Sequence, residues 1–157
     1  MKNIGQIVTE FNKLSRRDVK RIIKEKSDKV MEACINDTGN QELAAVEFGT
    51  LLYSVIAADD KVAGKEIKLL CTTAEAVLGD WVDPKKKKQL AEELLADKTA
   101  FEKGAKKLAT EYLTKWADAD KENLVFCCVA VCALDRKISN EELAWLDVLM
   151  NIANGNE

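Results

Sequence analysis

The stretch that decides the fold is IAADDKVAGKEI at residues 56–67, which the chain repeats at residues 132–143 as CALDRKISNEEL. The two copies place Asp59 in register with Asp135, and Glu66 in register with Glu142. An apolar stretch precedes each copy and a periodic apolar stretch follows it, so each predicts a helix, an acidic turn and a second helix. Helix pairs that each have one apolar face bury those faces by packing together. The duplication therefore predicts two helical halves around one core, related by a pseudo-two-fold axis.

Outward from these turns, apolar residues recur with the helical period over most of the chain. Apolar stripes predict helices through residues 4–11, 19–34, 48–56, 67–74, 90–95, 101–116, 124–134 and 143–153, with start signals at Ser15 and at Asp83-Pro84, and with Gly39 as a stop signal. Residues 124–134 are almost entirely apolar, which predicts a central helix covered on most sides. No alternating pattern of useful length predicts a strand. We expect an all-α bundle of about seven helices.

The length of 157 residues favours one domain, residues 1–157, in which residues 1–14 form a separate N-terminal amphipathic helix. No apolar run approaches the length of a membrane span, and the beginning of the chain lacks the apolar centre of a secretory signal. We therefore expect a cytoplasmic protein with reduced cysteines. The lysine run at residues 85–88 opposes the dipole of its own helix, which indicates a role in solubility or partner binding.

The sequence contains no histidine, which excludes Ser-His and Cys-His nucleophilic schemes and the commonest zinc ligand. The five cysteines form no CxxC pair, although Cys128 and Cys132 could share a helix face. Buried structural thiols are a simpler interpretation than a thiolate metal site. We expect no enzymatic activity; the enzymatic alternative is a hydrolase that activates water with magnesium or manganese at the acidic turns.

The acidic turns carry the candidate metal ligands. Carboxylate oxygens are the ligands that Ca²⁺ and Mg²⁺ prefer, and the two turns offer Asp59, Asp60, Glu66, Asp135 and Glu142. The alternative is local capping: in Ser139-Asn140-Glu141-Glu142, Ser139 would cap the helix and Glu142 would reach back to its amide. Ala63 has no oxygen with which to cap in the first copy, so capping explains Glu66 less well.

The turns also carry a family resemblance. Residues 58–62 with Glu66, and residues 134–138 with Glu142, resemble the A-D-G-x-[IV]-x-x-x-E element of TerB-like domains. That family includes the tellurite-resistance protein TerB and the amino-terminal domain of the DjlA co-chaperone. Where the family usually has glycine, this chain has Asp60 and Arg136. The resemblance implies a TerB-like helical fold, a bacterial or phage setting, and a role in stress, resistance or interaction systems, and it does not imply an enzyme.

Charge is segregated along the chain. Residues 1–30 hold nine basic and four acidic residues, although the whole chain has a net charge of −3. We expect an interaction module that binds a protein partner, with no small-molecule substrate evident. The alternative is a basic N-terminal helix that docks on an anionic membrane or on nucleic acid, through Lys13, Arg16, Arg17, Lys20, Arg21 and Lys24. Periodicity places Trp116 in the core and leaves the positions of Trp81 and Trp145 undetermined.

Overall fold

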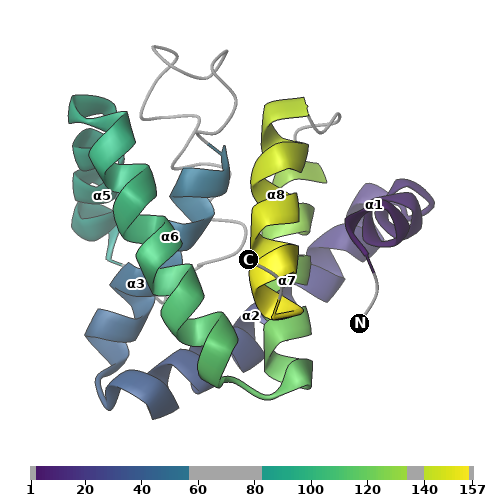
Figure 1. Cartoon of the computed structure of the whole chain (residues 1–157), viewed down its shortest axis with the longest axis horizontal. Coiled ribbons are helices and arrows are strands. Elements are labelled where there is room, and N and C mark those ends of the chain that lie inside the picture. Colours follow the sequence, from purple (N-terminus) through teal and green to yellow (C-terminus); the bar gives the residue numbers. More distant parts are fainter. Residues whose placement is uncertain (1–2, 57–82, 134–139, 156–157) are drawn as a thin grey trace.

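The computed structural model describes residues 3–56, 83–133 and 140–155, and these ranges are helical without strands (Figure 1). The described helices are α1 (Ile4–Asn12), α2 (Arg16–Thr38), α3 (Gln41–Ile56), α5 (Pro84–Ala96), α6 (Lys98–Lys115), α7 (Asp118–Ala133) and α8 (Asn140–Ala153). The expected all-α bundle is therefore confirmed. The helix expected after the first acidic turn lies outside the described residues, and the pseudo-two-fold duplication stays a prediction.

Local capping explains where several helices begin and end. The Asn3 side chain accepts from the Gln6 amide at 2.9 Å, while the Gln6 side chain accepts from the Asn3 amide at 3.0 Å. Asp83 accepts from the Lys85 amide at 2.8 Å, with proline at the first helical position of α5. Gly39 ends α2 at a φ of 69°, a left-handed conformation that favours glycine. The start signal at Asp83-Pro84 and the stop signal at Gly39 were predicted from the sequence, whereas the cap formed by Asn3 and Gln6 was not.

The core is centred on α7, whose residues 124–132 are all buried. Helices α1, α2, α3 and α8 all pack against α7. The helices that lead into the two acidic turns, α3 and α7, contact each other directly. The prediction of a central, widely covered helix is confirmed, because a helix that is apolar all round is stable only when neighbours cover most of its surface.

Helix α1 packs into the same core as the rest of the described chain. Its residues Ile4, Ile7 and Phe11 are buried, and it contacts both α7 and α8. The Phe11 ring lies 5.5 Å from the Phe126 ring, centroid to centroid. Residues 1–14 therefore contain a helix of their own. The apolar face of that helix packs into the core of the main bundle.

The lysine run at residues 85–88 departs from expectation at one position. Lys85, Lys86 and Lys88 are exposed, but Lys87 is only 5% exposed. Residue 87 shares a helix face with Leu90, Ala91 and Leu94, so the helical period turns it inward. The Tyr53 hydroxyl also donates to the Lys87 carbonyl at 3.1 Å, which ties α3 to the beginning of α5. The prediction that the lysine run serves solubility or partner binding is therefore wrong for Lys87.

None of the helices in the described ranges combines the length and apolar character that crossing a membrane requires. The longest of them, α2, has 23 residues but carries charged residues along its whole length. The cytoplasmic location expected from the sequence stays a prediction.

Candidate functional site

The first half of α2, together with Lys13 just before it, presents a strip of positive charge to solvent. We call Lys13, Arg16, Arg17, Lys20, Arg21 and Lys24 the basic face; all six residues are exposed. Residues 13–24 contain a single acid, Asp18. The second half of the helix, residues 25–38, is instead richer in acids than in bases. Positive charge is therefore concentrated at one end of α2.

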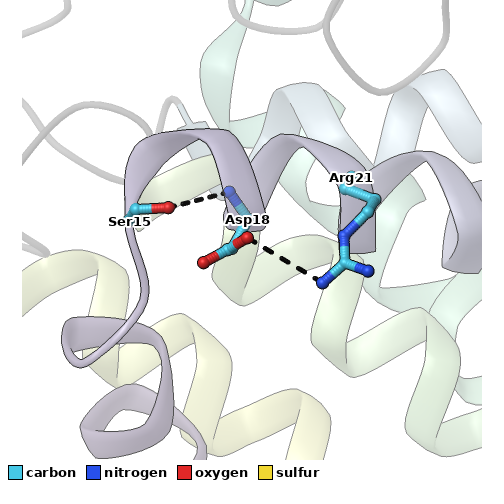
Figure 2. Close-up of polar contacts among 3 residues, drawn as sticks. All are labelled: Ser15, Asp18 and Arg21. Atoms are coloured by element: carbon cyan, nitrogen blue, oxygen red, sulfur yellow. Dashed lines mark hydrogen bonds and ion pairs between the residues drawn. The ribbon is translucent and has the colours of Figure 1, made fainter.

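Local contacts order the beginning of this helix (Figure 2). The Ser15 side chain accepts from the Asp18 amide at 3.1 Å, which caps α2. The Asp18 carboxylate then lies 3.8 Å from the Arg21 guanidinium, and the two side chains are 47% and 68% exposed. An ion pair this exposed contributes little to stability. It leaves the positive charge of the basic face largely uncompensated.

Burial of the opposite side of α2 orients the basic face outward. Val19, Ile23 and Val30 are buried, and α2 packs mainly against α7 and α3. Lys26 marks the boundary, because its ammonium turns inward, 4.5 Å from the Phe126 ring centroid, and donates to the Asn123 side chain at 3.3 Å. Sequence reasoning did not separate Lys26 from the surface lysines. Its inward placement follows from packing against α7.

The acidic turns fall almost entirely outside the described residues. Asp59, Asp60, Glu66 and Asp135 lie there, as does Ser139, the expected cap of the last helix. Glu142 is described: it occupies the first turn of α8 and is 7% exposed. Within the described ranges, no group of three acidic or thiol side chains is arranged to hold a metal ion. A cation site at the acidic turns therefore stays a prediction.

Calorimetry tests this cation site. Titration of Ca²⁺ and then Mg²⁺ into chelator-treated protein is expected to release or absorb heat, because carboxylates from both turns would supply oxygen ligands. The Asp59→Ala/Asp135→Ala variant should give no binding heat. Equal heat from the wild type and the variant would contradict a site at these aspartates, and heat from neither would leave them as turn and cap residues.

The described cysteines are buried. Cys34, Cys127, Cys128 and Cys132 are all buried in the core, and Cys71 lies outside the described residues. Burial raises the pKa of Cys128 to about 12 and also raises the pKa of Cys127 well above its ordinary value. Protonated thiols are poor nucleophiles and poor metal ligands. The burial of Cys34, Cys127 and Cys128 favours the structural interpretation of these three thiols.

Acidic side chains gather where α2, α3 and α6 meet. Burial, followed by the negative charges of Asp37 and Glu111, raises the pKa of Glu47. Burial also raises the pKa of Cys34 to about 12, with smaller contributions from Glu47 and Asp37. This acidic region includes the C-terminal half of α2, so the two ends of the helix carry opposite charge.

Tyr112 of α6 is buried in the core, and Trp116, which follows the helix, is half-buried and packs against the core, as predicted. The Tyr112 and Trp116 rings stack with centroids 4.8 Å apart and an interplanar angle of 16°. The Tyr112 hydroxyl and the Trp116 indole N–H are buried without a hydrogen-bond partner among the described residues. Trp145 is half-buried, which answers the question that the sequence left undetermined, while Trp81 lies outside the described residues.

The fold and the basic face together define a small all-α protein with an electrostatically polarised surface. Comparison with protein-family models, with curated proteins and with solved structures found no match. The resemblance to TerB-like domains therefore stays a prediction from the two acidic turns.

Proposed function

We propose that this chain is a non-enzymatic, TerB-like interaction module that binds an anionic macromolecular surface through the basic face. The setting implied by the resemblance is a bacterial or phage stress or resistance system. One observation carries the binding proposal: all six cations of the basic face are exposed, with a single acid, Asp18, among residues 13–24. Nucleic acid and an anionic membrane share the chemistry that would recognise this surface, namely closely spaced phosphates.

The placement of these charges supports a binding role over a stabilising one. Cations near a helix N-terminus oppose the helix dipole, and Arg16 and Arg17 occupy the first turn of α2. The last turn of α2, where cations would be favourable, holds none. The distribution of charge along α2 thus costs helix stability, and an anionic partner would offset that cost.

The mode of binding is expected to be electrostatic. The large apolar residues that are exposed in the described ranges are Leu43 and Leu95, on α3 and α5, and neither belongs to the basic face. Without an apolar anchor beside the cations, affinity would come from phosphate contacts and released counterions. Such binding weakens steeply as salt is added.

Neutralising half of the basic face is therefore expected to abolish most of the binding. The Arg17→Gln/Lys20→Gln/Lys24→Gln variant should bind roughly a hundredfold more weakly, because each cation near an anionic surface contributes about 1 kcal/mol. Two probes separate the partner classes: a fluorescent DNA duplex, measured by anisotropy, and phosphatidylserine vesicles, measured by co-sedimentation. Each titration is repeated at low and high salt.

The matched control is Lys85→Gln/Lys86→Gln/Lys88→Gln, which removes the same charge from exposed positions on α5. It should bind like the wild type if the basic face is the site. An equal loss in both variants would mean that only net charge matters. Binding that does not respond to salt, or no binding to either probe, would reject the proposed function.

A further inference from the structure

A second surface lies on different helices from the basic face. Helices α6 and α8 contact each other and run side by side in the same direction (Figure 1). Two hollows of about 520 and 500 Å³ lie between them, the first lined by residues early in both helices and the second by residues late in both. Lys106 and Val148 line both hollows, so the two hollows adjoin, and together they are called the groove.

The α8 side of the groove is apolar. Trp145, Val148 and Ile152 are half-buried and recur at the i, i+3, i+7 spacing of one helix face. The Trp145 indole N–H donates to the Ser54 hydroxyl at 3.2 Å, which fixes the ring against α3. A line of half-exposed apolar residues with a fixed tryptophan is typical of an anchor for a partner side chain.

The α6 side of the groove carries positive charge. Lys103 and Lys106 are exposed and lie one helical turn apart, and neither forms an ion pair with another described residue. Glu102 and Glu141 also line the first hollow. Farther along, the α6 side of the second hollow continues with the uncharged residues Thr110 and Thr114. The middle of the groove therefore pairs an apolar α8 side with two available ammonium groups.

We propose that this groove binds an amphipathic helix of a partner protein, whose apolar face covers α8 and whose acidic flank pairs with Lys103 and Lys106. The α6 lining from Thr99 to Thr114 spans roughly 22 Å, which accommodates about four turns of a partner helix. On the α6 side, Lys103 and Lys106 outnumber Glu102, and this surplus of positive charge favours an acidic flank over a basic one. The inference is independent of the basic face on α2.

A charge-swap experiment tests it. The probe is a designed helical peptide of about 18 residues with leucines at the i, i+3, i+7 spacing and two flanking glutamates one turn apart. Its twin carries lysines in place of those glutamates. Calorimetric titration with the wild type should favour the glutamate peptide roughly tenfold, because close charge pairs discriminate between partners. Amide chemical shifts should move along α6 and α8.

Three variants make the result specific. Lys103→Glu/Lys106→Glu should reverse the preference between the two peptides, whereas Lys85→Glu/Lys88→Glu, the same change on α5, should leave it unchanged. Ala144→Gln, at an exposed position in the groove lining, should weaken both peptides by filling the space. All five substituted positions are exposed, so the variants should fold.

Other results would overturn the inference. Shift changes confined to α2, or loss of peptide binding in the Arg17→Gln/Lys20→Gln/Lys24→Gln variant, would place the peptide on the basic face. Equal affinity for the two peptides would remove the role of the lysines. A dimer in sedimentation that Ala144→Gln dissociates would make a second copy of this chain the occupant. Because the peptide preference does not involve the basic face, it can fail without affecting the proposed function.

Discussion

Raising the pH to about 10.5 is expected to lower the free energy of unfolding by about 2 kcal/mol for each of two buried thiols, Cys34 and Cys128. Burial raises the pKa of both from the ordinary value of 9.0 to about 12. Between these two values the unfolded chain releases a proton that the folded chain retains. The stabilisation is therefore complete below pH 9.0 and is lost as the pH rises through about 12.

Urea unfolding at about pH 8 and about pH 10.5 measures this loss. Lysines and tyrosines also titrate in this range, so the informative quantity is the difference in pH dependence between the wild type and Cys34→Ala/Cys128→Ala. The variant loses packing at both pH values, but it should lose about 4 kcal/mol less than the wild type on going to the higher pH. The same pH dependence in both proteins would contradict protonated, structural thiols.

The second large effect concerns two neighbouring leucines on α5. Leu94→Ala is expected to lower the free energy of unfolding by about 3 kcal/mol, because removing a buried leucine side chain leaves a cavity in a packed core. Leu94 is 1% exposed, whereas Leu95 is 43% exposed. Leu95→Ala should therefore change stability by less than about 1 kcal/mol. Denaturant unfolding of both variants against the wild type measures the difference.

This pair controls for everything except burial, since the chemical change and the helix are the same. Similar losses for the two variants would mean that α5 does not pack on α3 and α6 as described. A loss for Leu95→Ala alone would reverse the assigned orientation of the helix. Either outcome would also remove the basis for placing Lys87 inside.

The two proposed binding surfaces make different physical demands on a partner. The basic face is an exposed strip of charge along α2 and the preceding Lys13, so it recognises charge density and is sensitive to salt. The groove is a shaped depression between two helices, so it recognises apolar side chains at helical spacing and uses Lys103 and Lys106 for selection. The salt dependence of binding therefore separates the contribution of the basic face from that of the groove. This holds whether one partner binds both surfaces or two partners bind one surface each.

Several features could be predicted from the sequence because they depend on residues that are close together in the chain. The helical period, Ser15 and Asp83 as caps, and Gly39 as a stop are local patterns. The apolar run at residues 124–134 also predicted the central helix, since so few of its residues suit a solvent-exposed face. The exposure of the basic face followed as well, because its cations recur at helical spacing opposite Val19 and Ile23.

Whether an individual charged residue is exposed or buried could not be predicted in the same way. Lys26 and Lys87 stand in sequence surroundings as polar as those of Lys24 and Lys88, yet Lys26 turns toward Phe126 and Lys87 is buried. Their burial depends on which neighbouring helix covers that side, and the sequence pattern of a single helix does not contain this information.

The sequence by itself determined an all-α chain, the positions of its helices and the charge polarity of α2, because each of these follows from spacing and capping within one segment. Only the tertiary structure decided that α6 and α8 run side by side, that Trp145 reaches Ser54 on α3, and that a groove with two lysines lies between them. Those contacts join residues far apart in the chain, and their geometry is set by how side chains of facing helices interlock.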